Sequence, residues 1–199
     1  MLIIGEGDSE NAYFKELKSQ HNLKFHIKPE LPSSSDYKSI FKKAKENIDV
    51  YECVFCLIDL DHILNSDNCE QNYEKYKTEK TKLREKFPSI FIFESCPCFE
   101  IWLFFHFDDK SQPVETYCKI LVEKKLKKYL PDYDFNKKAE SIKSAYSELQ
   151  KRQAFAIQKS EEYRKIRKIK IDNGDYNESN CPISFTEIDL IFQKLLKDK

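Results

Sequence analysis

Three acidic residues follow stretches whose composition is typical of buried β-strands. Glu6 comes after Leu2-Ile3-Ile4, and Asp59 and Asp61 come after the apolar run 53–58. In open parallel α/β sheets, ligands bind beyond the carboxyl ends of the strands, so neighbouring strands would gather these carboxylates at one edge. Clustered carboxylates repel one another unless a cation lies among them. Their hard oxygen atoms suit Mg²⁺ or Mn²⁺, and the sequence therefore indicates a divalent-metal site.

The Asp-x-Asp spacing of Asp59 and Asp61 adds a geometric reason. Alternate side chains of an extended chain lie on the same face, so this pair can hold one ion or bridge two. Two ions about 3.5–4 Å apart can clamp the attacking and leaving oxygens of a phosphoryl transfer. A plainer interpretation also fits. An Asp after a strand is commonly a turn residue or helix cap, and Glu6 lies between two glycines, where it can simply be exposed.

A second candidate segment runs from Cys98 to Phe107, where Glu100 and His106 are the only polar residues among ten. A helix this apolar is buried nearly all round, and a buried carboxylate needs a partner or a metal. For Glu100, a functional role and a purely structural ion pair or hydrogen bond are therefore equally well supported interpretations. His106 is more typical of a satisfied core histidine.

The pattern of apolar residues predicts strands and helices in alternation over the first half of the chain. The expected strands cover 2–4, 23–27, 53–58 and 89–93, and the expected helices begin near Asp8 or Ser9 and at Asp36 and then cover 69–86 and 97–107. Further helices are expected at 114–129, at 136–169 with a possible break, and at 184–197. This order predicts an α/β fold with a mostly parallel central sheet flanked by helices. We expect a core of residues 1–110 and a helical C-terminal extension of residues 111–199 packed on it.

Composition limits the class of protein. The 199 residues are 40% hydrophobic, which argues against disorder, and no apolar run is long enough to cross a membrane. The N-terminus lacks the features of a signal peptide, so we expect a cytoplasmic protein whose seven cysteines are reduced. Cys53-x-x-Cys56 lies inside an expected strand without a matching second pair, which argues against zinc. Net charge is zero, but basic runs at 124–128 and 151–171 would either contact phosphates or form solvated helix faces.

Two segments together carry a family resemblance. Residues 4–14, Ile-Gly-Glu-Gly-Asp-Ser-Glu-Asn-Ala-Tyr-Phe, resemble the opening Glu-Gly-x-x-Glu-x-x-Tyr-Phe motif of RloB-like proteins. Residues 95–107, Ser-Cys-Pro-Cys-Phe-Glu-Ile-Trp-Leu-Phe-Phe-His-Phe, resemble the family's Ser-Asn-Pro-Cys-Phe-Glu-x-Trp-Leu-x-x-His-Phe signature. The Asp-x-Asp at 59–61 lies where the family has its own, and 180–184 is loosely similar to a later Asn-Pro-Ser-Thr segment. Cys96 in place of Asn and the interruption at Ile183 are departures, and neither removes a candidate ligand.

RloB-like proteins resemble Toprim nucleases of the OLD type, and the resemblance implies a Toprim-like fold, Mg²⁺ dependence and a role in bacterial anti-phage defence beside an ATPase partner. Glu6 would act as a ligand or as the general acid/base, Glu100 would complete or support the site, and His106 would be an accessory residue. The metal ligands implied by the motifs are Glu6, Glu10, Asp59, Asp61 and Glu100.

The function expected from these observations is a metal-dependent nuclease that cleaves DNA or RNA, with tRNA among the candidate substrates. One alternative is a haloacid-dehalogenase-like phosphatase, in which Asp59 would be phosphorylated and Asp61 would be the acid/base. Against it, that motif usually opens the fold and continues into a Thr, whereas His62-Ile63-Leu64 follows here. The other alternative is a non-catalytic module that senses a signal or binds a partner.

Overall fold

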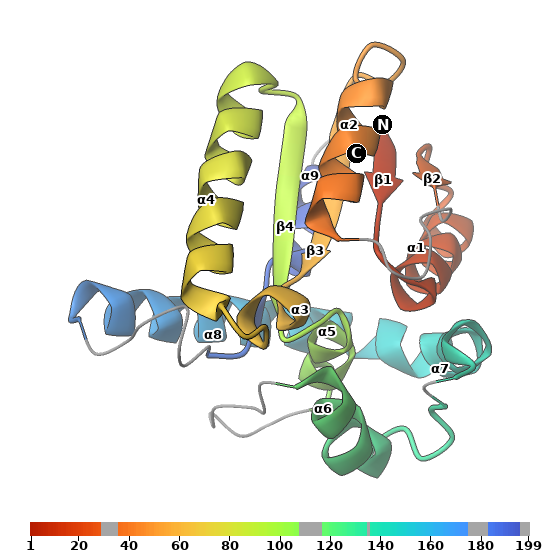
Figure 1. Cartoon of the computed structure of the whole chain (residues 1–199). Helices are drawn as coiled ribbons and strands as arrows, with labels where there is room; N and C mark the ends of the chain where they lie inside the picture. The colour runs from red at the N-terminus through yellow and green to blue at the C-terminus, as the bar shows by residue number, and fades with distance from the viewer. Residues whose placement is uncertain (29–35, 108–116, 135, 175–182, 196–199) are drawn as a thin grey trace.

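The computed structural model describes residues 1–28, 36–107, 117–134, 136–174 and 183–195. Within them a five-stranded sheet has the order β2-β1-β3-β4-β5 (Figure 1). Its strands are β1 (Leu2–Ile4), β2 (His26–Lys28), β3 (Val54–Asp59), β4 (Ile90–Cys96) and β5 (Phe185–Thr186). The first four strands pair in parallel, and β5 pairs antiparallel with β4. The predicted α/β fold with a mostly parallel sheet is confirmed.

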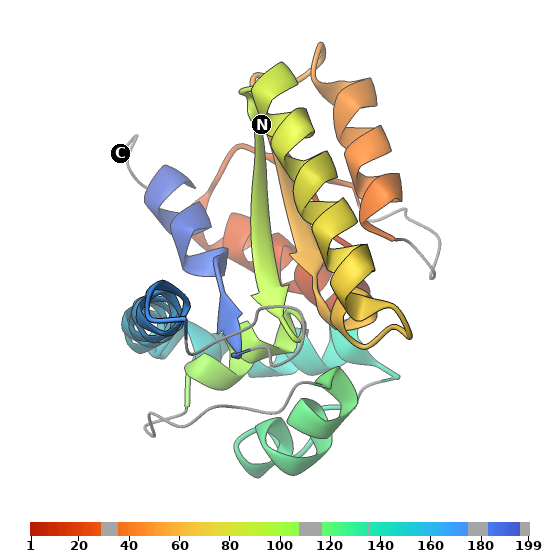
Figure 2. The ribbon, with the colours of Figure 1, turned by 60° about the vertical axis from the view of Figure 1, so that its left-hand side comes forward.

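Helices cover both faces of the sheet and the space beyond its carboxyl edge (Figures 1 and 2). Those of the first half are α1 (Asp8–His21), α2 (Tyr37–Asn47), α3 (Asp61–Leu64), α4 (Cys69–Lys86) and α5 (Glu100–Phe105). Those of the second half are α6 (Cys118–Lys124), the 3-10 turn η1 (Leu126–Lys128), α7 (Lys138–Lys151), α8 (Gln153–Asp172) and α9 (Ile188–Leu195). In Figure 2 the arrowhead of β4 points toward the layer that contains α5, α6 and α7.

The strands are apolar on both sides because each side packs on a different core. Val54, Cys56 and Ile58 pack with the apolar side chains of α2 and α4. Phe55 and Leu57 alternate with them and pack into the larger core formed with α1, α5, α7 and α8. Side chains of a strand alternate between faces, so an unbroken apolar run is what a strand buried on both faces requires.

The predicted helix boundaries are partly right. Asp36 caps α2 as predicted, since its carboxylate accepts a hydrogen bond from the Ser39 amide at 3.0 Å. The expected break in the long C-terminal helix lies at Arg152, between α7 and α8. Neither Asp8 nor Ser9 is the cap of α1, because Gly7 is the residue before that helix. The parts of the expected helices at 114–116 and 196–197, and residues 180–182 of the segment similar to the family, lie outside the described residues.

Two differences concern the carboxyl edge of the sheet. The helix expected from Pro97 begins only at Glu100, after a cis Cys96–Pro97 bond. The helix expected from Ser184 is preceded by strand β5, whose Phe185 and Thr186 pair with β4. A two-residue strand is too short to leave a periodic signal, so the sequence pattern could not reveal it.

The cysteines differ from the expectation of free thiols at one pair. Cys98 and Cys118 form a disulfide, although 20 residues separate them. Because they lie close only after α5 and α6 have packed, their spacing in the sequence gave no sign of the bond. Cys53 and Cys56 are free. None of the described helices is long and apolar enough to span a membrane.

Candidate metal-binding site

Glu6 and Asp59 are brought together by the pairing of two adjacent parallel strands. Ile4 of β1 is in register with Cys56 of β3, so both chains leave the sheet at the same edge. Glu6 lies two residues beyond β1, and its Oε1 accepts a hydrogen bond from the Asp59 amide at 3.4 Å. Asp59 is the last residue of β3, and Asp61 begins the short helix α3. Glu6 therefore contacts Asp59, and Asp61 lies close enough for its charge to raise the pKa values of both.

Glu10 enters the same site from the first turn of α1, and two glycines make room for it. A Cβ atom at Gly5 would lie 3.0 Å from the Glu10 Cβ, and one at Gly7 would lie 3.1 Å from its Oε2. Both contacts are closer than ordinary van der Waals packing, so larger residues would displace the carboxylate. The Gly-Glu-Gly sequence is therefore explained by the close approach of the turn to Glu10, which is 4% exposed.

Glu100 approaches from the start of α5 and is held by three donors on one oxygen. Its Oε1 accepts hydrogen bonds from Ser9 Oγ at 2.7 Å and from Tyr133 OH at 3.0 Å, and lies 3.1 Å from Lys138 Nζ. Tyr133 and Lys138 were missed by the sequence analysis, because no motif marks them and they lie 33 and 38 positions beyond Glu100 in the chain. Ser9 lies within the N-terminal motif, where the sequence indicates only a possible helix cap.

The disulfide lies against the other oxygen of Glu100. Cys118 Sγ is 3.3 Å from Glu100 Oε2. In the described part of the chain, Cys98, Glu100 and Cys118 form the one group of three or more His, Cys, Asp or Glu residues whose ligand atoms all lie within 4.8 Å of one another. Sulfur binds metals as a thiolate, so a disulfide does not supply such ligands. The remaining carboxylates are more widely spaced than this group and would have to close around a shared ion.

Burial and mutual repulsion raise the pKa values of these acids. The pKa of Glu6 rises to about 9 through burial and then through the charge of Glu10. The pKa of Glu10 rises to about 7 through burial and then through Glu100. Burial also raises the pKa of Asp59, where Glu10 adds the largest charge effect, and that of Asp61. A cation among them would reverse these shifts, and a set of four or five carboxylates fits Mg²⁺ or Mn²⁺ by its hard oxygen donors.

His106, the remaining predicted site residue, lies in the aromatic core. Its Nδ1 is 2.8 Å from the Trp102 carbonyl oxygen, and its ring packs against those of Trp102 and Tyr13. Complete burial lowers the pKa of His106 to about 4, so it is neutral near pH 7. The described contacts of the ring are with aromatic side chains and backbone, and the structure does not bring it together with the carboxylates.

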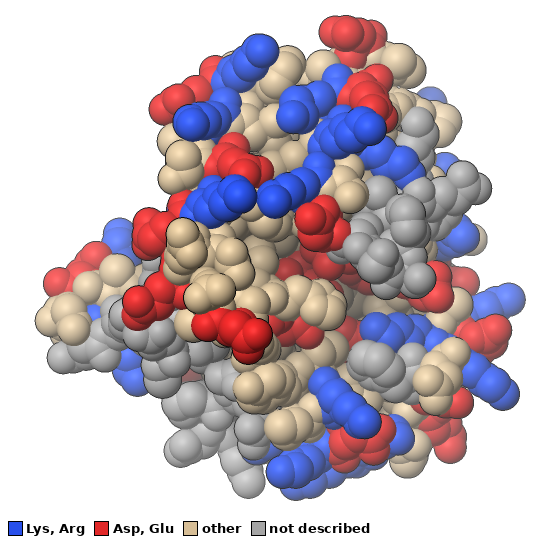
Figure 3. Space-filling view, in the orientation of Figure 1, with Lys and Arg blue, Asp and Glu red and all other residues tan. Residues whose placement is uncertain are grey.

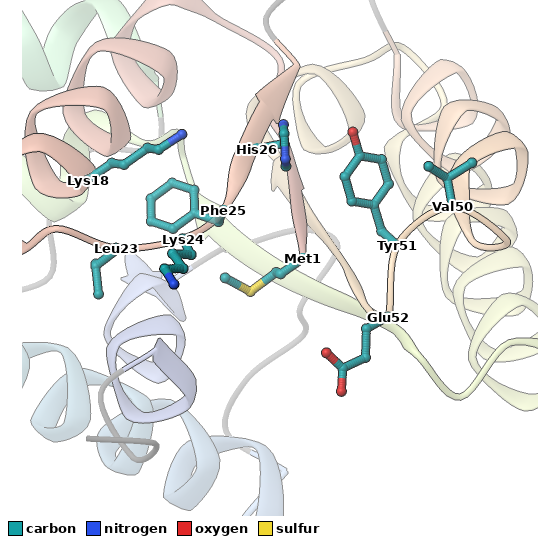
Figure 4. A pocket seen from close by; sticks show the side chains of 9 residues that line it. All are labelled: Met1, Lys18, Leu23, Lys24, Phe25, His26, Val50, Tyr51 and Glu52. Atoms are coloured by element: carbon teal, nitrogen blue, oxygen red, sulfur yellow. The ribbon is translucent and has the colours of Figure 1, made fainter.

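The surface agrees with the position of the acidic residues. Figure 3 shows Asp and Glu atoms gathered in a hollow toward the middle of one face. A separate depression lies at the opposite edge of the sheet, where Met1 and His26 lead into the strands (Figure 4). It is lined by Met1, Lys18, Leu23, Lys24, Phe25, His26, Val50, Tyr51 and Glu52. We place the candidate site at the acidic hollow, because ligands of such sheets bind at the carboxyl ends of the strands.

The fold and the site together define an α/β protein with buried carboxylates at the carboxyl ends of its parallel strands. Within that class, the chain belongs to the family of RloB-like proteins, whose family model matches residues 1–195. Searches among curated proteins and among solved structures gave no match. Membership of the family suggested by the motifs at 4–14 and 95–107 is therefore confirmed.

Proposed function

We propose that this protein is a metal-dependent nuclease of the Toprim type that hydrolyses phosphodiester bonds. The observation that carries the proposal is the convergence of Glu6, Glu10, Asp59 and Asp61 at the carboxyl ends of β1 and β3, with raised pKa values. Buried acids whose pKa values are strongly shifted by their neighbours are typical of functional sites. A divalent ion is the partner that would stabilise their charged forms.

In this proposal Glu6, Asp59 and Asp61 hold the ion, and Glu10 closes the site from α1. Mg²⁺ or Mn²⁺ supplies Lewis-acid stabilisation of charge on phosphate oxygens when bound. Glu6 is also the candidate for the general acid/base, the role that the family resemblance implies for it. Glu100 supports the site through Ser9 and Lys138.

The biological setting that we propose follows from the family resemblance. RloB-like proteins resemble nucleases of the OLD type, and we propose a role in bacterial anti-phage defence, in the cytoplasm, beside an ATPase partner. The proposed substrate is DNA or RNA, with tRNA included. Several residues of the basic runs are already paired within the chain, as in the ion pairs Lys127–Glu123 and Lys165–Glu161, so we do not assign the substrate surface to those runs.

Cleavage assays with a matched substitution test the proposal. We expect the wild-type protein to cleave DNA or RNA with Mg²⁺ or Mn²⁺ and to be inactive in EDTA. Asp59→Asn should reduce cleavage by about 100-fold or more, the scale of losing a major electrostatic group in a site. The control is Asp67→Asn, the same change at an exposed residue six positions after Asp61, which should retain full activity.

The proposal fails if Asp59→Asn cleaves as well as Asp67→Asn does. A phosphomonoester is included as a third substrate, because its turnover, lost in Asp59→Asn, would instead identify a phosphatase. Folding of each variant is checked by circular dichroism, so that loss of activity is not confused with loss of structure.

A further inference from the structure

We propose that Lys138 occupies the place of a metal ion at Glu100, so that the divalent ions of this site are bound by Glu6, Glu10, Asp59 and Asp61 alone. The inference rests on the proposed function and reduces its set of metal ligands from five carboxylates to four. The sequence motifs treat Glu100 as a metal ligand, whereas in the structure its charge is already balanced by an ammonium group from another part of the chain.

The first argument is the ion pair itself. Lys138 Nζ lies 3.1 Å from Glu100 Oε1, and the two side chains are 24% and 1% exposed. An ion pair with one partner fully buried is weakly screened by solvent, and the carboxylate cannot lose its cation without a large cost. Lys138 therefore belongs to the site and is not a casual surface contact.

The second argument is that one oxygen of Glu100 is already surrounded by donors. Oε1 accepts hydrogen bonds from Ser9 and Tyr133 as well as contacting Lys138. Oε2 lies 3.3 Å from the Cys118 sulfur, which belongs to a disulfide. A metal ion could bind Oε1 only after displacing Ser9, Tyr133 or Lys138.

The third argument is where Lys138 comes from. It is the first residue of α7, and α7 packs along α1, the helix that carries Glu10. The same packing that positions α1 against the sheet therefore also delivers the ammonium group. Glu100 therefore needs no added metal ion, because folding of the chain brings the positive charge of Lys138 to its carboxylate.

Binding of Mn²⁺ tests the inference without measuring activity. Mn²⁺ is titrated into metal-free protein and the number bound per chain is read by electron paramagnetic resonance or calorimetry. We expect Glu100→Gln to bind the same number of ions as the wild type, with an affinity within about threefold, since it removes no ligand. Lys138→Met should tighten Mn²⁺ binding by about tenfold or add one ion per chain, because a buried carboxylate then needs a new cation.

Matched variants separate this effect from others. Lys137→Met removes the charge of the exposed neighbouring residue and should bind Mn²⁺ as the wild type does. Lys138→Arg keeps the positive charge and should bind Mn²⁺ as the wild type does. It also serves as the folded control if Lys138→Met is unstable. The added ion should be absent from the double variant with Glu100→Gln, and any tightening that remains there reflects the Lys138 charge acting on Glu10 and Asp61.

The outcomes distinguish the two proposals. Loss of one Mn²⁺ ion in Glu100→Gln would show that Glu100 is a ligand and would overturn the inference, while the nuclease proposal would stand. Lys138→Met and Lys137→Met with equal Mn²⁺ binding would also overturn it. A wild-type protein that binds no Mn²⁺ at all would instead remove the metal site on which the proposed function depends.

Discussion

Two clusters of buried carboxylates lie in the described part of the chain, and they are neutralised in different ways. The cluster where β4 meets β5 has its own cations. Glu94 accepts a hydrogen bond from Tyr76 at 2.6 Å and pairs with Lys80 at 2.5 Å, and Asp189 is bound by both terminal nitrogens of Arg164. The chain therefore supplies a positive partner to each of these two acids, as buried structural ion pairs require.

The cluster at the ends of β1 and β3 is not matched in this way. In the described residues its closest cation is Lys138, 3.1 Å from Glu100, and His62 lies 3.9 Å from Asp61. Glu6 and Glu10 accept backbone hydrogen bonds, and Glu6, Glu10 and Asp59 all carry raised pKa values. We interpret the first set as acids that stabilise the fold, and we propose that the second set binds an external cation. Experiments on each set can test this comparison.

The largest effect on stability is expected from Arg164→Met, which removes the cation of the structural cluster. Asp189 is 1% exposed, and leaving such a charge unpaired costs about 3–5 kcal/mol of the free energy of unfolding. Chemical denaturation measures this loss, and Mn²⁺ affinity should be unchanged. Lys165→Met, which removes an exposed cation on the same helix, is the control and should leave the denaturation midpoint unchanged. A large change in Mn²⁺ affinity in Arg164→Met would show that the two clusters are not independent.

A smaller effect, of several degrees in Tm, is expected from pH in the metal-free protein. Glu6 and Glu10 titrate at about 9 and 7 in the folded protein and near the ordinary value of 4.5 when unfolded. The folded state thus holds more protons than the unfolded state between these limits, so its stability falls as pH rises from about 5 to 9. Mg²⁺ should raise Tm at pH 8 and have little effect at pH 5. A Tm in EDTA that is flat or rises over this range would contradict the raised pKa values.

The smallest effect is expected from His106→Phe. The ring lies in the core and is bonded to the Trp102 carbonyl, so its replacement should cost about 1 kcal/mol for the lost hydrogen bond. Nucleic-acid cleavage should stay within about threefold of the wild type. A loss of about 100-fold or more with the fold and metal binding intact would restore the accessory catalytic role that the family signature implies.

The sequence predicted the parts of the site that depend on strand ends. Glu6, Asp59 and Asp61 could be found because an apolar run followed by an acid places that acid at the carboxyl edge of a parallel sheet. Glu100 could be suspected because it is a carboxylate in an otherwise apolar segment. In both cases local sequence carries the information, since burial follows from composition and the parallel arrangement follows from the alternation of strands and helices.

The parts that the sequence did not predict depend on packing between distant segments. Lys138 and Tyr133 reach Glu100 only because α7 packs on α1 and the chain before it covers the edge of the sheet. The Cys98–Cys118 bond and the two-residue strand β5 depend on the same kind of long-range contact. For His106 the family signature suggests a role in the site, but the helix that carries this residue places its side chain in the core. Membership of a motif therefore does not by itself predict that a polar residue lies in the site.

Titration of Mn²⁺ into the metal-free wild-type protein and into Asp59→Asn, followed by electron paramagnetic resonance, tests the central claim most directly. Carboxylates that converge without enough cations of their own should give saturable binding in the wild type, weakened by about 100-fold or more in Asp59→Asn, with Asp67→Asn unchanged. Absence of binding in the wild type, or equal binding in all three proteins, would contradict the assignment of this edge of the sheet as a metal site.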